Sequence, residues 1–232
     1  MRMPEVRAQG AQPAPFHYSE FRFTDAARVA AIVRAFPLAL VVSECNGMAY
    51  ASHIPLMWPE ASSQLLGHTD ARNPQFCAAG SVDARIFFCG PQSYVPTDAY
   101  VTRQLPTWNY VAVHLSARID VLNAPAAKLD ILAQMAAVLD GPQAAPAFAG
   151  QEERVRQLLS NITGLRVHIQ HQEARIKLSQ DKSPEDQRAA LDHLLAMQGA
   201  GARSFLESLM DGITGGENET PGAAAPRAGP SM

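Results

Sequence analysis

The 232-residue sequence has no excess of positive charge, no long apolar run and no basic leader. Lys and Arg number 19 against 22 Asp and Glu, so the formal net charge is -3 and no overall positive field exists to hold a polyanion. A membrane span needs roughly 18 consecutive apolar residues, and no such run occurs. We therefore expect a cytoplasmic protein without membrane contact, for which DNA is a possible partner that the charge does not support.

Cysteine is scarce as well, with only Cys45, Cys77 and Cys89. No two of them have the spacing of a zinc site or a dithiol redox motif, so we expect free, buried thiols. The histidines fall on different predicted strands without a compact ligand motif, and we expect no metal site. The motifs of the nucleophile elbow, the P-loop and the dinucleotide fingerprint are also absent, which disfavours the common hydrolase and dinucleotide-binding folds.

What the sequence does contain is an ordinary globular composition, with 47% hydrophobic and 18% charged residues. Both ends are rich in Ala, Gly and Pro, and they cannot bury enough apolar surface to offset the entropy lost on ordering. We predict a mobile N-terminal tail over 1–14 and a main domain over 15–182. Beyond it we predict helices packing on that domain over 183–211 and a disordered tail over 212–232.

Most of the predicted elements are strands. Runs of β-branched and alternating apolar residues predict strands over 38–43, 48–57, 64–69, 85–89, 111–121 and 164–178. Asn46-Gly47 tolerates the positive φ of a tight turn and predicts a hairpin between the first two. The apolar phase of the last strand changes around 171–173, which predicts a bulge or tight turn there. Prolines mark 90–106 as a long surface loop.

The clearest strand covers 111–121, because apolar and polar residues alternate strictly along it. One face therefore points to the core and the other meets something polar. The same alternation, extended backwards, places Trp108 and Tyr110 on the polar face with His114. Two aromatic side chains away from the core invite a ligand or a partner subunit.

Helices are expected around these strands. The patterns of caps and apolar stripes predict helices over 24–35, 125–139 and 152–160, a helix that starts at Ser183 and breaks at Gly199, and a last helix over 204–210. Leu191, Leu194 and Leu195 form the apolar stripe of the Ser183 helix. The fold class is therefore mainly β with peripheral helices and a C-terminal helical pair, arranged as a small antiparallel barrel.

Polar and aromatic side chains cluster where the predicted strands end. These clusters cover residues 52–56, 67–68, 72–74, 106–110 and 177–180. Their hydroxyl, amide and cationic donors suit a phosphate, and their aromatic edges suit a flat ring, so they fit a heteroaromatic ligand with a phosphate tail. The same residues could instead cap the ends of a barrel, and composition does not choose between the two interpretations.

The order of these motifs resembles the PaiB family, described as FMN-binding negative transcriptional regulators. The resemblance spans about 15–210 and depends most on Pro-Thr-Trp-Asn-Tyr at 106–110 and Lys-Leu-Ser-Gln at 177–180. Further matching motifs lie at 52–55, 67–68, 73–75, 90–95 and 113–114. The resemblance implies an FMN-binding split β-barrel that forms a homodimer, with FMN in a cleft at the subunit interface.

By the same resemblance, a set of cofactor-binding positions can be assigned. They are Ser52, His53, Ile54, His68, Arg72, Asn73, Thr107, Trp108, Asn109, Tyr110, Lys177, Ser179 and Gln180. Lys177 and Thr107 suit the phosphate, and Trp108 suits the flavin ring. The sequence differs from the family pattern at 70–72, 96–99 and 174–176; at the first of these, Arg72 stands one place later than the family's arginine. The sequence therefore leaves open whether the protein retains FMN or has a reshaped site.

Three functions follow from the resemblance and from the residues. The first is a flavin-binding repressor of transcription, although the helices over 184–210 have an acidic first turn and few cations for reading DNA. The second is an FMN-dependent oxidoreductase or flavin reductase acting on a small molecule, with the chemistry supplied by the cofactor. His114 and His53 could serve as acid or base there, but structural histidines are the favoured interpretation. The third is a flavin-binding protein without turnover.

Overall fold

The computed structural model describes residues 18–45, 47–60, 62–76, 80–141, 148 and 150–199. The predictions for both tails, for the helix over 204–210 and for Cys77 lie outside these residues. The described helices and strands are η1 Ser19–Phe21, β1 Arg22–Phe23, α1 Ala26–Ala35, β2 Leu38–Cys45, β3 Met48–Met57, β4 Gln64–Asp70, η2 Pro74–Phe76, β5 Ser81–Val95, η3 Thr97–Ala99, β6 Thr107–Leu122, α2 Pro125–Asp140, α3 Glu152–Leu158, η4 Leu159–Asn161, β7 Ile162–Lys177 and α4 Pro184–Met197.

The strands form one antiparallel sheet that closes on itself. Its order is β1-β7-β4-β3-β2-β5-β6, and β6 also pairs with β7, which joins the two sides of the sheet. The predicted hairpin of β2 and β3 is present, with Cys45 pairing with Met48, and Gly47 at its turn has a φ of 76°. The prediction of a mainly β fold built as a barrel with peripheral helices is confirmed.

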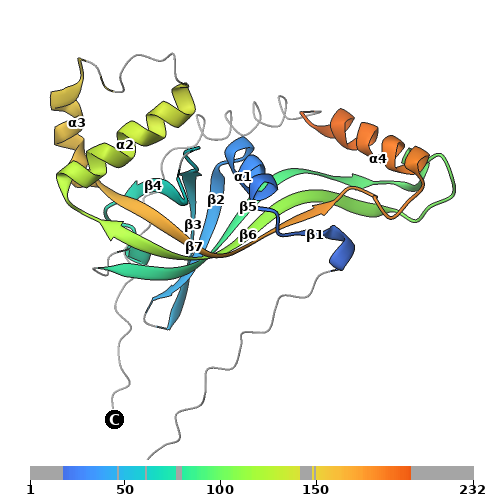
Figure 1. The fold of residues 1–232 in the computed structure, drawn as a ribbon, viewed down its shortest axis with the longest axis horizontal. Helices are drawn as coiled ribbons and strands as arrows, with labels where there is room; N and C mark the ends of the chain where they lie inside the picture. The colour runs from blue at the N-terminus through green and yellow to red at the C-terminus, as the bar shows by residue number, and fades with distance from the viewer. Residues whose placement is uncertain are drawn as a thin grey trace, which may run out of the picture.

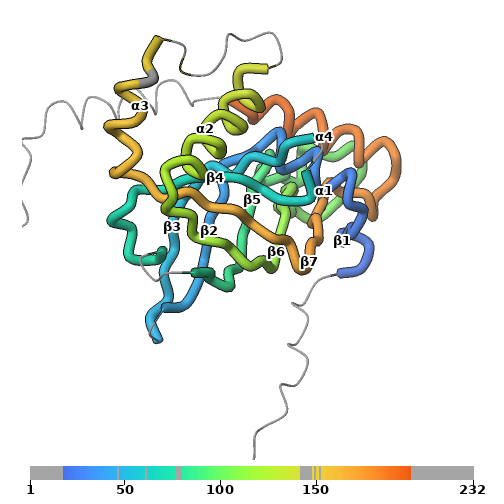
Figure 2. Tube along the Cα trace, turned by 60° about the vertical axis from the view of Figure 1, so that its left-hand side comes forward, coloured from blue at the N-terminus to red at the C-terminus, as the bar shows by residue number. Residues whose placement is uncertain are grey.

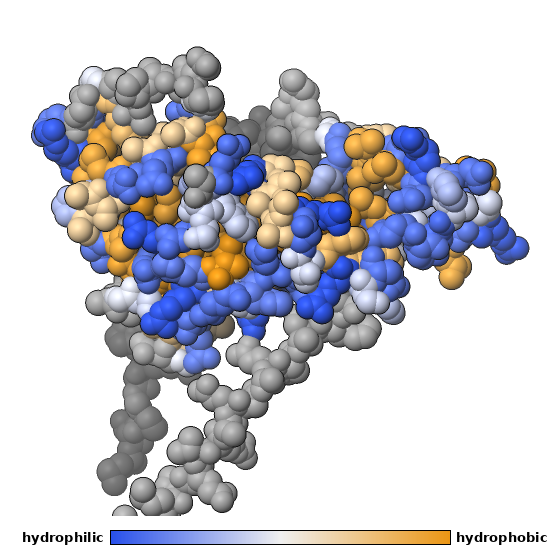
Figure 3. Space-filling view, in the orientation of Figure 1, coloured by the Kyte–Doolittle hydropathy of each residue, from blue (hydrophilic) through white to orange (hydrophobic). Residues whose placement is uncertain are grey.

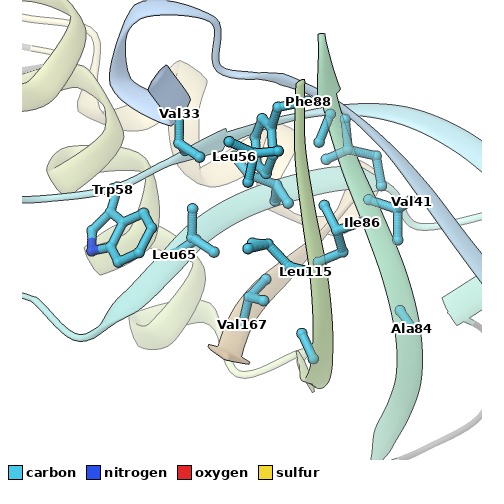
Figure 4. Close-up of a cluster of buried hydrophobic side chains, with 14 of the residues drawn as sticks. Val33, Val41, Leu56, Trp58, Leu65, Ala84, Ile86, Phe88, Leu115 and Val167 are labelled. Atoms are coloured by element: carbon cyan, nitrogen blue, oxygen red, sulfur yellow. The ribbon is translucent and has the colours of Figure 1, made fainter. Parts of the chain in front are cut away.

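The inside of the barrel is apolar, as the alternation along β6 predicts. Val113 and Ile119 are fully buried, Leu115 and Ala117 are nearly so, and Arg118 faces solvent. Their neighbours across the barrel interior come from every long strand, as Figure 4 shows for Leu56, Leu65, Ile86, Phe88 and Val167. Burial of large side chains on this scale is the main force that holds the closed sheet together.

Helices cover the barrel at separate places (Figure 1). α1 begins at Asp25, whose carboxylate accepts a hydrogen bond of 2.8 Å from the Arg28 backbone N–H, and it buries Val29 and Val33 against the core. α2 and α3 lie at one end of the molecule, where Ile131 packs so closely on β7 that a Cβ at Gly164 would stand 2.9 Å from it. α4 lies at the opposite end (Figures 1 and 2).

The far end of the molecule is a two-stranded extension of the barrel, which we call the arm. It consists of residues 92–95 of β5 and 107–110 of β6, and α4 packs on it through Val95, Tyr100 and Ala190. The prediction of a loop over 90–106 is wrong for 90–95. The register shift between Cys89 and Gln92 leaves Gly90 and Pro91 outside the ladder, so the proline breaks no pairing and the strand continues.

Three further predictions need correction. The bulge in β7 exists, but the extra residue is Gln170, just before the predicted 171–173, because Ser116 pairs with His171 and Ala117 with Ile169. Cys45 and Cys89 are free thiols but are not buried, and Cys89 lies on the outer face of β5. Leu195 is 59% exposed because only the Ala190 and Leu194 side of α4 faces the arm.

The surface is mixed in character. Figure 3 shows apolar side chains gathered over α2 and α3 and again near the arm, with polar side chains between them. Within the described part of the chain, no helix has the length and apolarity to cross a membrane.

Candidate flavin site

The predicted site residues fall into two groups on opposite parts of the barrel. The β4 group comprises Ser52, His53, Ile54, His68, Arg72 and Asn73, and the arm group comprises Thr107, Trp108, Asn109, Tyr110, Lys177, Ser179 and Gln180. Strand β7 passes both, because Gly164 pairs with His68 and Lys177 pairs with Tyr110. About 13 residues separate these pairs, a length of roughly 40 Å along a strand. The two groups therefore lie near the two ends of β7.

Asn73 organises the β4 group. Its side-chain amide donates to the hydroxyls of Ser52 at 3.0 Å and Thr69 at 3.1 Å, and its oxygen accepts from the Gln75 backbone N–H at 3.1 Å, which starts η2. Because both hydroxyls accept from Asn73, each keeps its own hydrogen for another acceptor. Thr69 joins this cluster although the sequence analysis did not single it out, and its place one residue after Gly67-His68 was the available signal.

His68 adds an imidazole to the same region. Its Nδ1 is buried and has no hydrogen-bond partner among the described residues, and desolvation lowers the pKa of the ring below its ordinary value. The ring is therefore neutral at pH 7, with one donor and one acceptor. The strand at this point is pressed against β3, because a Cβ on Gly67 would stand 2.5 Å from a methyl group of Leu56.

The other predicted members of the β4 group point elsewhere. Arg72 binds the carboxylate of Asp70 through two bonds of 3.0 and 2.7 Å, and its side chain is 90% exposed. Arg72 lowers the pKa of Asp70 to about 2, so the pair stays charged in all but strong acid. Ile54 belongs to the barrel core, and His53 is exposed on the outer face of β3.

A pocket of about 450 Å³ marks the arm group, between the start of the described chain and the end of β7. Lys177, Thr107 and Tyr110 line it. The Lys177 ammonium donates to the Thr107 hydroxyl and lies 5.9 Å from the ring centre of Phe21. The structure therefore brings Lys177 and Thr107 together, and their role with phosphate stays a prediction.

The Lys-Leu-Ser-Gln motif forms a tight turn at the end of β7. Ser179 is buried in a left-handed conformation, with a φ of 59°, and its hydroxyl lies within hydrogen-bond distance of Asn109 and of the Tyr100 hydroxyl. Gln180 folds back, accepting from the Leu178 N–H at 2.6 Å and donating to the Ile176 carbonyl. The turn is thus fixed by hydrogen bonds of Asn109, Ser179 and Gln180. It directs the chain toward α4, which packs on the arm.

The helix side of the turn is fixed by Asp186, which lies in the acidic first turn of α4. This fully buried carboxylate accepts from the Thr102 N–H at 2.8 Å, from the Thr102 hydroxyl at 2.5 Å and from Gln104 at 3.0 Å. The hydrogen bonds from Thr102 lower the pKa of Asp186 to about 2. A lone acid inside a helix start gave no signal of this role.

Aromatic side chains cover the face of the arm that α4 leaves open. Trp108 is 51% exposed and Tyr94 is 50% exposed, with ring centres 6.3 Å apart. Trp108 donates to the Gln92 side chain at 3.2 Å, which fixes the plane of the indole. The prediction that Trp108 lies away from the main core is confirmed.

The residues present suit a flavin nucleotide. A phosphate needs several hydrogen-bond donors, and the β4 group offers the hydroxyls of Ser52 and Thr69 and the imidazole of His68. A flat ring needs aromatic surface, and the arm offers Trp108 and Tyr94. A closed antiparallel barrel with these two surfaces belongs to the class of flavin-binding barrels.

Comparison with known proteins defines the family. Residues 16–171 match the family model described as "Putative FMN-binding domain", so the chain belongs to this FMN-binding family and FMN is its cofactor. It is 26% identical over 206 residues to Protease synthase and sporulation protein PAI 2 of Bacillus subtilis (strain 168), covering 82% of this chain and 94% of that protein. The resemblance to the PaiB family is thereby confirmed.

Solved structures share the fold. The flavocytochrome Anf3 from Azotobacter vinelandii aligns with a TM-score of 0.53 at 17% identity, covering 73% of this chain and 75% of that one. The FAD and heme binding protein from Mycobacterium smegmatis aligns with a TM-score of 0.51 at 17% identity, covering 73% and 80%. At this identity the likeness shows the barrel architecture alone.

Proposed function

We propose that the protein is a cytoplasmic homodimer that binds FMN between its subunits, with the β4 group of one chain facing the arm of its partner. The observation that carries this proposal is the separation of roughly 40 Å along β7 between the two groups. FMN is much shorter than this stretch of strand. The β4 group and the arm group of one chain therefore belong to two different sites, and each site is completed by the other group of a second chain. Closed symmetry then gives two equal sites for each dimer.

The chemistry of each group assigns its part of the cofactor. Ser52, Thr69 and His68 donate to the phosphate, while the side chains of Trp108 and Tyr94 from the partner cover the flavin ring. Asn73 positions the two hydroxyls, and Ile54 contributes only its backbone because its side chain is in the core. Lys177 and Thr107 lie where the arm joins the barrel. There the Lys177 ammonium supplies a positive charge beside the cofactor, and the Thr107 hydroxyl accepts a hydrogen bond from it. FMN, when bound, supplies hydride and electron transfer.

The proposed biological role is control of gene expression, as in the PaiB-type repressors that the motifs resemble. The relative named for protease synthesis and sporulation supports a regulatory role. Direct reading of DNA is not favoured by α4, which carries Glu185 and Asp192 beside a single exposed cation, Arg188. Contact with DNA would therefore come through a partner or a basic face formed in the dimer.

An FMN-dependent oxidoreductase is the second candidate. The acidic α4 and the formal net charge of -3 favour it over a protein that holds DNA by itself. Oxidation of reduced nicotinamide nucleotide by the FMN-loaded protein separates this function from the regulator and from a flavin carrier. A regulator or carrier shows no turnover above that of free FMN.

The intersubunit site can be tested by complementation. His68→Ala damages the β4 group and Trp108→Ala damages the arm, so each homodimer is expected to lose stoichiometric FMN, read from the flavin absorbance band. A mixed dimer of the two variants, purified through two different tags, has one intact site and should retain half of the wild-type FMN. If the mixed dimer binds no FMN, or if light scattering shows a monomer that binds FMN fully, the proposal is wrong.

A further inference from the structure

The outer face of β5, β6 and β7 carries a pocket that shares no residue with the β4 group or the arm group. Its volume is about 360 Å³, at the lower end of the range of small-molecule sites. It is lined by Arg85, Phe87, His114, Leu115, Ser116, His171, Glu173 and Arg175. We call it the outer-face pocket.

The strand registers arrange this pocket in rows. In the first row Arg85 of β5 pairs with Ser116 of β6, which pairs with His171 of β7. In the second row Phe87 pairs with His114, and His114 pairs with Glu173. Side chains at alternate positions share a face, so the two rows stand next to each other on the outside of the barrel. The bulge at Gln170 is what turns His171 and Glu173 to this face.

The first row is a set of hydrogen-bond donors. Arg85 donates to the Ser116 hydroxyl, and the His171 imidazole is exposed beside them. On the same outer face, Asp83 of β5 is engaged by Arg118 at 3.6 Å, and Glu44 of β2 lines a neighbouring pocket together with Arg85. The row therefore combines a guanidinium, a hydroxyl and an imidazole, which is the donor chemistry that a carboxylate recognises.

The second row provides a flat apolar surface. The rings of Phe87 and His114 meet edge to face, with centres 4.8 Å apart. Such a pair packs well against a third ring, because aromatic rings prefer offset or edge contacts at about 4.5–7 Å between centres. A planar ligand on this row places its substituent over the first row.

The only acid of the pocket lining is already neutralised. Glu173 is 2% exposed and accepts from Arg175 at 2.9 and 2.7 Å and from Arg22 at 2.9 Å. Burial acts to raise the pKa of this carboxyl, but the bonds from Arg175 and the charges of Arg22 and His114 hold it below the ordinary value. Two guanidinium groups thus serve this one carboxylate, so the only acid of the pocket lining brings no net negative charge to the pocket.

We propose that the outer-face pocket binds a small aromatic carboxylate, with the carboxylate against Arg85, Ser116 and His171 and the ring against Phe87 and His114. The site is independent of the proposed FMN site. The first row recognises the negative charge of the ligand, and the second row recognises its planar ring.

The probe is 4-fluorobenzoate, followed by fluorine NMR on the purified full chain with and without saturating FMN. Saturable binding is expected in both forms. 4-Fluorobenzamide, which has the same shape without the charge, is expected to bind at least about tenfold more weakly. Cyclohexanecarboxylate, which has the charge without the flat ring, is expected to compete only weakly.

Variants locate the ligand. Arg85→Gln is expected to weaken binding by about tenfold, which corresponds to about 1.4 kcal/mol. Phe87→Leu is expected to weaken it several-fold. Arg118→Gln, a cation in the next row of the same face, is the matched control and should change the affinity by less than about twofold.

Several outcomes overturn the proposal. These are the absence of saturable binding, equal binding of the amide, an Arg118→Gln effect as large as that of Arg85→Gln, or competition between FMN and 4-fluorobenzoate. The last outcome would make the pocket part of the flavin site. Since binding is measured with and without FMN, a failure of the proposed FMN dimer leaves this test intact.

Discussion

The barrel and the arm are built by different forces. In the barrel, alternation puts apolar side chains such as Leu115 and Ile86 inside a closed sheet, and each position is held by many neighbours. In the arm, the apolar cluster of Val95, Tyr100 and Ala190 is small, and buried hydrogen bonds add to it. These bonds join Asn109 to Ser179 and Thr102 to Asp186. Hydrogen bonds fix geometry but add little net stability. The comparison indicates that the arm can open while the barrel stays folded.

Leu115→Ala should have the largest effect, because it empties a nearly fully buried position in the barrel core. We expect a loss of about 2–5 kcal/mol in the free energy of unfolding, measured by urea denaturation. The transition of the barrel should move to lower urea, whether or not the arm opens before it. An unchanged barrel transition would contradict the assignment of Leu115 to the core.

Asn109→Leu tests the polar frame of the arm. Removal of the amide leaves the Ser179 hydroxyl without its Asn109 partner in a buried place, at a cost of about 1–3 kcal/mol. Hydrogen exchange should accelerate over the arm and α4 but not over β2 and β3. The matched control is Ser93→Ala, whose buried hydroxyl has no partner among the described residues and whose loss should leave exchange unchanged. Equal acceleration in both variants would show that packing, not the amide, holds the arm.

Asp186 makes the arm sensitive to acid. Because the pKa of this carboxyl falls from the ordinary 3.8 to about 2 on folding, the charged form stabilises the folded arm above pH 3.8, and that stability is lost as the pH falls toward 2. The protection of the α4 amides, which is the intrinsic exchange rate at each pH divided by the observed rate, should fall as the pH is lowered from 5 to 2.5.

In Asp186→Asn, the protection of the α4 amides should be lower at pH 5 and less dependent on pH. Asp70 has a similarly lowered pKa, so Asp70→Asn is the control, with the acid response of α4 retained. If the response disappears in Asp70→Asn instead, the acid sensitivity of the arm does not come from Asp186.

Asp70→Asn also supplies the smallest expected effect, this time on the barrel side of the flavin site. Solvent screens an exposed ion pair, so the release of Arg72 from Asp70 should raise the affinity for FMN by no more than a few-fold. Titration of FMN with the protein, followed by the change in flavin absorbance, measures this gain in affinity. Adding Arg72→Ala to Asp70→Asn should abolish it. A gain that persists in this double variant would exclude Arg72 as its source.

The same division explains what the sequence could predict. Strict alternation at 111–121 and the capped start at Asp25 predicted β6 and α1, because burial and capping are local patterns. The strand over 90–95 was missed because Pro91 resembles a loop residue until its place at the bulge is known. Thr69 and Asp186 were missed because single polar residues carry no period.

The candidate site was predicted by residue but not by arrangement. The Asn73 and Lys177 motifs were found in the sequence, whereas their separation follows from the long pairing of β7 with β6 and β4. Such non-local registers leave no mark on a single segment. Sequence reasoning therefore named both halves of the proposed flavin site and could not show that they belong to different ends of one strand.

The bulge at Gln170 has a consequence for how the gene can change in length. Gln170 is the unpaired bulge residue between two regular stretches of pairing. Its removal would join them into one uninterrupted strand, and all the remaining side chains would keep the face they have now. The middle of β7 is thus a place where one codon can be lost without turning the barrel inside out. Comparable losses further along the same strand would exchange the two faces unless the bulge absorbed them.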